Sequence, residues 1–110
     1  MRFALLLFDH EDYWAQVPQA EMKAAVAGHA AFGRYLGERG VPFTAAALKP
    51  QSEARTLRSG GPAADGPFTP LREDLAGIYL VECADPDEAE EIARRCPMGA
   101  GIEIRPLWEA

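Results

Sequence analysis

The chain has 110 residues, which is the usual size of a single domain with one hydrophobic core. With 17 acidic and 11 basic side chains its formal net charge is −6, so nucleic acid and anionic membrane surfaces are poor candidate partners. Hydrophobic residues make up 48% and charged residues 25%, as in globular proteins and unlike disordered ones. We therefore expect one folded domain over residues 1–110 that binds neither nucleic acid nor membranes.

The N-terminal segment Arg2–Phe8 is short and almost continuously apolar. Such a run is typical of a central strand that is buried on both faces. Asp9 ends it before it reaches the length of a signal-peptide core or a membrane span. Cys83 and Cys96 lie far from any CxxC pattern. Together these features predict a cytoplasmic protein with two reduced thiols.

A long amphipathic helix is predicted over Gln19–Arg39. Pro18 suits the start of a helix, because a first turn needs no amide donor, and Gly40 is a common terminator. Apolar residues recur every three or four positions, as they do on one face of a helix. They are Met22, Ala25, Val26, Phe32, Gly33 and Leu36. His29 falls in line with this stripe, so we expect its side chain to face the sheet.

The middle of the chain contains three strand candidates. Phe43–Leu48 and Ala54–Arg58 are predicted strands, joined by a connection of hairpin length at residues 49–52. Residues 59–71 are dense in Gly and Pro, which argues against regular structure and predicts either a loop of fixed shape or a mobile lid. Ala76–Glu82 is rich in strand-favouring residues and is predicted to be the next strand.

The second helix has a clear start. Asp85 is a good N-cap, Pro86 fits the first helical position, and Glu88 lies where a capping box requires it. Pro97 is expected to end this helix. The segment Gly101–Leu107 then reads as a final strand whose isoleucines face the core.

The order of these elements predicts an α+β domain of the ferredoxin-like β-α-β-β-β-α-β type, with an antiparallel sheet and both helices on one face. The other face of the sheet is left bare. A bare apolar face on so small a protein is normally covered by a partner, and a two-fold related copy is the simplest one. We therefore expect a homodimer whose subunits share this sheet face.

Three groups of residues could carry chemistry. Asp9–Asp12 supplies three carboxylates and an imidazole, but adjacent residues cannot all point at one ion, so we expect neither a bound metal nor a cofactor. His29 is either a satisfied core histidine or, if a carboxylate holds its ring, an oriented base. Asp65-Gly66-Pro67-Phe68 has the composition of a tight turn.

The same tetrapeptide resembles the motif that names the DGPF branch of the YCII-related family. The similarity spans nearly the whole chain. The matched landmarks are Leu5-Leu6-Leu7, Ala31-Phe32, Gly40, Ala47-Leu48-Lys49-Pro50, Arg72-Glu73, Leu75, Gly77, Tyr79, Glu88-Ala89 and Glu103-Ile104-Arg105-Pro106. The resemblance implies a ferredoxin-like subunit, a dimeric α+β barrel and a biochemical function that is mostly unassigned.

The resemblance also implies a site. Proteins similar to the narrower YCII type have a histidine in the first helix that forms a His-Asp pair, and His29 is spaced from Gly40 as theirs is. Asp65 is the nearest substitute for the acid by motif. One related protein is a dehydrochlorinase of chlorinated hydroxyquinols. Relatives in the DGPF branch are often encoded near extracytoplasmic-function sigma factors, which implies a functional link to such a factor.

Two hypotheses follow. The first is a small-molecule-binding or regulatory homodimer, with a pocket between the first helix, the sheet and residues 59–74. Its expected ligand-binding residues are Phe32, Phe68, Arg72 and Glu73. The second is a lyase of the dehydrochlorinase type, in which His29 removes a proton, Asp65 holds its tautomer and the glycine-rich loop excludes water.

Overall fold

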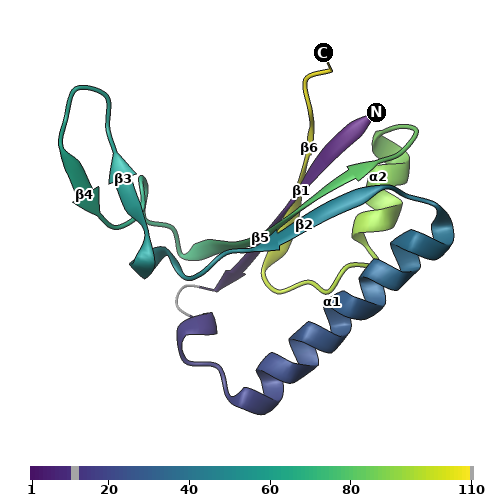
Figure 1. The fold of residues 1–110 in the computed structure, drawn as a ribbon, viewed down its shortest axis with the longest axis horizontal. Helices are drawn as coiled ribbons and strands as arrows, with labels where there is room; N and C mark the ends of the chain where they lie inside the picture. The colour runs from purple at the N-terminus through teal and green to yellow at the C-terminus, as the bar shows by residue number, and fades with distance from the viewer. Residues whose placement is uncertain (11–12, 110) are drawn as a thin grey trace.

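The computed structural model describes residues 1–10 and 13–109, and it folds as one α+β domain (Figure 1). The described residues form two α-helices, two short 3-10 helices and six strands. In chain order they are β1 (Arg2–His10), η1 (Tyr13–Ala15), α1 (Gln19–Arg39), β2 (Phe43–Ala47), η2 (Gln51–Glu53), β3 (Arg55–Leu57), β4 (Ala63–Asp65), β5 (Glu73–Glu82), α2 (Pro86–Ala93) and β6 (Gly101–Pro106).

Four of the strands form one antiparallel sheet in the order β2-β5-β1-β6. β1 is central, as its apolar run predicts, and pairs with β5 on one side and β6 on the other. This order, with a helix following β1 and another following β5, is consistent with the predicted ferredoxin-like fold. No helix in the described ranges is long and apolar enough to cross a lipid bilayer.

The core lies between one face of the sheet and both helices. Alternate side chains of β1 point to this face, because successive strand residues point to opposite sides. They meet the buried residues of α1, α2 and β5 in a single cluster. Its members are Phe3, Leu5, Leu7, Phe32, Leu36, Val41, Tyr79, Val81, Ala89, Ile92, Ala93 and Cys96. Ile102 and Ile104 of β6 pack against this cluster, as the sequence predicts.

The helix boundaries follow the capping signals. α1 spans the predicted residues, and Gly40 closes it with a φ of 77°, a left-handed conformation that suits glycine. At the start of α2 the Asp85 carboxylate accepts a hydrogen bond of 2.8 Å from the Glu88 amide. The Glu88 side chain in turn accepts one of 2.7 Å from the Ala84 amide. α2 ends at Ala93, before the residue expected to terminate it, and short turns fill the gap.

The opposite face of the sheet has no helix on it. Strand register places Ala4 and Leu6 of β1 on this side, opposite Leu80 and Ile78 of β5. Phe8 lies on the same side, beyond a register shift that separates it from Leu7. We call this surface, lined by Ala4, Leu6, Phe8, Ile78 and Leu80, the open face. The β1 and β5 residues on this side are apolar, and Thr44 of β2 and the Glu103–Arg105 pair of β6 flank them.

The segment between β2 and β5, residues 48–72, forms an arm that departs from the prediction. The strand after β2 pairs with β4 and not with β2, so the expected hairpin between these two strands is wrong. The connection contains Pro50 and the η2 turn, which lead the chain away from the sheet. β4 also lies within the glycine- and proline-rich segment, where no strand was expected. Its three residues fit between Pro62 and Gly66, so the strand is too short to give a periodic signal.

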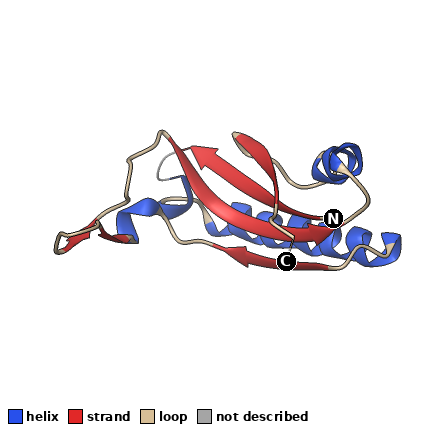
Figure 2. Ribbon diagram, turned by 90° about the horizontal axis from the view of Figure 1, so that it is seen from above, coloured by secondary structure: helices blue, strands red, loops and turns tan. Residues whose placement is uncertain are grey.

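The arm extends away from the sheet in both views (Figures 1 and 2). It makes the molecule flat and wide, with extents of 44 × 41 × 18 Å. The radius of gyration is 15.3 Å, whereas a compact chain of this length has about 13 Å. The arm therefore does not fold back over α1 as a lid within its own subunit.

Candidate functional site

His29 faces the sheet from the middle of α1, as its place in the apolar stripe predicts. Its Nδ1 atom is 2.7 Å from the hydroxyl of Tyr79 on β5, and the two rings stack with centroids 5.8 Å apart. The imidazole is only partly buried. No buried side-chain polar atom in the described residues lacks a hydrogen-bond partner, and Nε2 makes no hydrogen bond with them. Nε2 is therefore accessible from solvent.

Tyr79 is held by an aromatic cluster. Phe32 of α1 packs edge-on against it with ring centroids 5.0 Å apart, and Phe43 of β2 lies 6.1 Å away. Because the Tyr79 ring is almost fully buried among these groups, its hydroxyl has a fixed position. Burial raises the pKa of Tyr79 to about 12, and the nearby Cys96 thiol acts in the same direction. The hydroxyl therefore keeps its proton at neutral pH.

Burial lowers the pKa of His29 below its ordinary value, and the negative charge of Asp9 acts in the opposite direction. The imidazole is consequently neutral at pH 7. A neutral ring beside a protonated phenol has two proton arrangements. If Tyr79 donates to Nδ1, Nε2 carries a proton and can donate it to a ligand. If Nδ1 donates to Tyr79, Nε2 is a base. Both arrangements direct a polar atom toward solvent.

Asp9 is the carboxylate that acts on His29 within the chain. It follows the apolar run of β1, and its side chain accepts a hydrogen bond from the Trp14 indole. Gly99 covers it from the other side. A Cβ at Gly99 would meet the Asp9 Oδ1 atom at 1.4 Å, so a larger residue at this position would displace the carboxylate. Trp14 and Gly99 together fix the orientation of Asp9.

The predicted contact between His29 and Asp65 does not occur within one subunit. Asp65 ends β4 in the arm, where its side chain is 98% exposed and faces Arg55 at 4.0 Å. The physical reason is that β4 pairs with β3 in the arm, and the arm projects away from α1 (Figure 1). Tyr79 takes the place at His29 that the prediction gave to Asp65.

The four predicted ligand-binding residues are divided between two regions. Phe32 is buried in the core and supports Tyr79 from behind. Phe68 and Arg72 are exposed in the arm, and Glu73 begins β5 where the arm rejoins the sheet. The structure therefore brings Phe32 to His29 but leaves Phe68, Arg72 and Glu73 apart from it.

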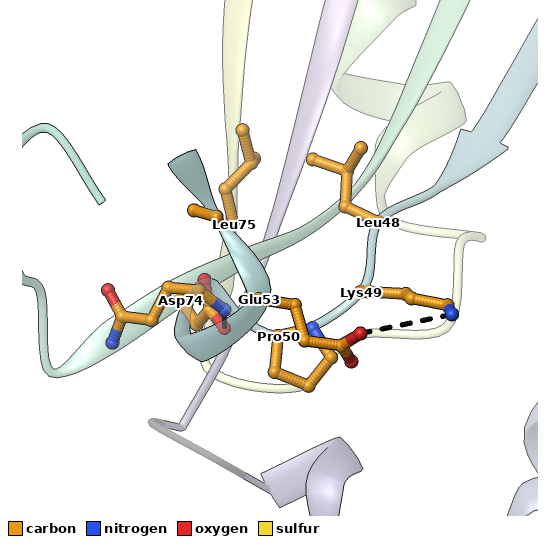
Figure 3. Close-up of a pocket in the computed structure, with 8 residues that line it drawn as sticks. Leu48, Lys49, Pro50, Glu53, Asp74 and Leu75 are labelled. Atoms are coloured by element: carbon orange, nitrogen blue, oxygen red, sulfur yellow. Dashed lines mark hydrogen bonds and ion pairs between the residues drawn. The ribbon is translucent and has the colours of Figure 1, made fainter. Parts of the chain in front are cut away.

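Two open hollows of about 420 Å³ each lie at the root of the arm, and His29 lines neither of them. The first lies between the β2–β3 connection and β5, with Leu48 and Leu75 on its apolar side and a Lys49–Glu53 ion pair at its edge (Figure 3). The second is lined by Phe8, Leu71, Glu73, Ala100, Gly101, Ile102 and Glu103. We call this second hollow the rim hollow.

The described residues contain no group of three or more His, Cys, Asp or Glu side chains that could hold a metal ion. Of the Asp9–Asp12 stretch considered above, Glu11 and Asp12 lie outside the described residues. Cys83 and Cys96 are both free thiols.

Sequence reasoning missed two members of the site. Asp9 was considered only as a metal ligand, although its place at the end of a central strand puts it at the edge of the sheet. Tyr79 was treated as a strand-forming landmark. One signal could have identified Tyr79. It is a polar group at a core-facing position of a strand, opposite the histidine in the apolar stripe of the helix, and such a group needs a hydrogen-bond partner.

The chain is similar to known proteins over nearly its whole length. The chain is 34% identical over 114 residues to an uncharacterized protein of Rhizobium meliloti (strain 1021), and the match covers 97% of this chain and 92% of that relative. The YCII-related domain matches residues 1–110. On this full-length match, the chain belongs to the YCII-related family.

Proposed function

We propose that this protein is a homodimer that binds a small molecule at the His29–Tyr79 pair. The observation that carries the proposal is a neutral imidazole, oriented by a buried hydroxyl, whose Nε2 atom reaches solvent. Oriented polar atoms beside an apolar core are typical of small-molecule sites. The ligand would have a hydroxyl, carbonyl or similar polar group that hydrogen-bonds with Nε2. Membership of the DGPF branch and a functional link to an extracytoplasmic-function sigma factor remain predictions.

The dimer is proposed on the open face. Leu6, Ile78 and Leu80 would be covered by the same residues of a second copy, which gives the α+β barrel that the family resemblance implies. The exposure of Leu80, which is 37% in the single subunit, supports this, because a large apolar side chain on a sheet face is normally covered by a partner.

Light scattering tests the dimer. The wild-type chain should have twice the subunit mass at micromolar concentration, and Leu80→Glu should shift it to a monomer by placing a charge in the apolar interface. Val26→Glu, on the exposed side of α1, is the control and should remain dimeric. A wild-type monomer would contradict the proposal.

The ligand site is tested through the two histidines. A compound library is screened by the NMR signals of the imidazole Cε1 protons, which His10→Gln and His29→Gln assign. A true ligand should shift the His29 signal and leave that of His10 unchanged, and His29→Gln should weaken its binding about tenfold or more, because a buried polar pair then loses its partner. Compounds that bind to His29→Gln as tightly as to the wild type would show that the ligand binds at another site.

A second function, lyase chemistry of the dehydrochlorinase type, is favoured by the position of Asp9. In this alternative the neutral His29 removes a proton from carbon, chloride leaves with its bonding electrons, and a new carbon–carbon π bond forms. Asp9, not Asp65, would stabilise the imidazolium that results. Chloride release from a chlorinated hydroxyquinol, lost in His29→Gln and retained in His10→Gln, would support this function.

A further inference from the structure

The arm projects from the sheet and leaves two large apolar side chains mostly exposed in their own subunit. Leu57 is 75% exposed and Phe68 62% exposed. Such side chains on an extended element are unusual unless another surface covers them. Since the arm points away from its own sheet and helices, a covering surface must come from another molecule (Figure 1).

The root of the arm is fixed by a hydrogen-bonded clamp. The backbone amide of Gln51 donates a hydrogen bond of 2.8 Å to the Asp74 carboxylate. The side-chain amide of Gln51 forms two hydrogen bonds with the backbone of Leu71, of 2.9 and 3.4 Å. Further out, the Thr56 hydroxyl donates to the Gly66 carbonyl at 2.7 Å, and the Gly66 amide donates to Ala54 at 2.8 Å. An arm held at both levels is preorganised for docking, which lowers the entropic cost of association.

The arm presents an aromatic ring and a cation together. The Arg58 guanidinium lies 4.3 Å from the centroid of the Phe68 ring and donates a hydrogen bond of 2.5 Å to the Phe68 carbonyl. Phe68 is thereby held in place in the described structure although it is exposed. Its complement would be an apolar hollow with a carboxylate at the edge.

The rim hollow has these properties. Phe8, Leu71 and Ile102 supply apolar surface, and Glu73 and Glu103 also line the hollow. Glu103 is paired with Arg105 at 2.5 Å. Glu73 forms no ion pair with the described residues, so it is the carboxylate that could receive an incoming cation.

Charge distribution identifies the partner as a second copy. The arm, residues 48–72, carries four basic and two acidic side chains, whereas the rest of the chain carries seven basic and fifteen acidic ones. The arm is therefore positive and the body strongly negative. The arm of one copy fits the body of another, and two such contacts related by a two-fold axis form a closed dimer.

We propose that the arms are exchanged between subunits, so that Phe68 and Arg58 of one copy occupy the rim hollow of the partner. This inference rests on the homodimer proposed above and adds a second contact region to its open-face interface. The Asp65-Gly66-Pro67-Phe68 motif is then a docking element, in which the turn positions the phenylalanine that the partner receives.

Photo-crosslinking tests the exchange. Phe68 is replaced by p-benzoylphenylalanine, which retains an aromatic ring, in a mixture of ¹⁵N-labelled and unlabelled chains allowed to exchange subunits. Irradiation should give covalent dimers, with the link in residues 71–73 or 100–103 of the other copy. The control carries the probe at Val26, which has the same 62% exposure but lies on α1. It should give no link to the rim hollow.

Light scattering on the same samples separates the two proposals. A dimer without a link from position 68 to the rim hollow, or with links only within one chain, would overturn the arm exchange and leave the open-face dimer standing. A monomer would overturn both.

Charge exchange gives a second measurement. Arg58→Glu and Glu73→Lys should each raise the dimer dissociation constant at least about two- to fivefold, as expected for losing one exposed ion pair. The double variant should recover much of the loss, because it restores an opposite-charge pair across the interface. Single variants with the wild-type dissociation constant would contradict the pairing of Arg58 with Glu73. A double variant in which the two losses of affinity add up would also contradict it.

Discussion

Leu36 in the sheet body and Leu57 in the arm are the same residue type in opposite environments. Leu36 is fully buried between α1 and the sheet, and Leu57 is 75% exposed on β3. The body is held by an apolar core, whereas the described contacts of the arm are mainly hydrogen bonds between its backbone and a few polar side chains. The arm therefore has a fixed shape without a core of its own. Its apolar residues serve something other than the stability of the subunit.

Truncation of these two leucines should give the largest difference in the free energy of unfolding between the two regions. Leu36→Ala should lower the free energy of unfolding by about 2–5 kcal/mol, because it leaves a cavity in the core. Leu57→Ala should change it by less than about 0.5 kcal/mol. Urea titration measures both in a Leu80→Glu background, so that the comparison concerns single subunits. Equal losses would show that the arm packs on its own body.

Substitution of two glycines, one in each region, should change the free energy of unfolding less than Leu36→Ala does. Gly99→Ala should cost about 1–3 kcal/mol, because its Cβ would overlap the Asp9 carboxylate. The displaced Asp9 would no longer raise the pKa of His29, so that pKa should fall further. Gly61→Ala in the arm meets no atom closer than 3.7 Å and should change stability by no more than about 1 kcal/mol. Thermal unfolding and NMR titration measure the two quantities. An unchanged His29 pKa in Gly99→Ala would separate Asp9 from the site.

The pH dependence that His29 contributes to the free energy of unfolding should be smaller still. Its folded-state pKa is lowered, so below its unfolded value of about 6.5 the unfolded chain binds more protons than the folded one. This contribution to stability is full above that pH and is lost as pH falls. Denaturant midpoints between pH 7.5 and 5 should drop less in His29→Gln than in the wild type. A drop in His29→Gln as large as that in the wild type would contradict the lowered pKa.

The parts of the fold that were predicted are those set by local signals. Pro18 and Gly40 bound α1, and Asp85 starts α2, because capping satisfies backbone groups within a few residues. β1 was predicted because its apolar run is almost continuous. The partner of β3 was missed, since short strands with alanine and glycine carry little information about pairing.

The site was only half predicted for a related reason. Helical periodicity places His29 on the face toward the sheet, and this much is correct. Its hydrogen-bond partner lies 50 residues away on β5, and which strand residue stands opposite depends on the sheet register. The motif at Asp65 suggested a nearer carboxylate, but the arm carries that motif away from α1.

The pairing of β1 has a consequence for how the chain folds. Arg2 lies opposite Glu82, and Phe3 lies opposite Pro106, so β1 can pair only with segments that are synthesised much later than itself. Contacts between residues so far apart slow folding, because a long loop must close before the strands can pair. During synthesis the apolar run Phe3–Phe8 therefore remains without its strand partners until β5 and β6 have emerged, and that interval is when a nascent chain of this protein is most prone to aggregate.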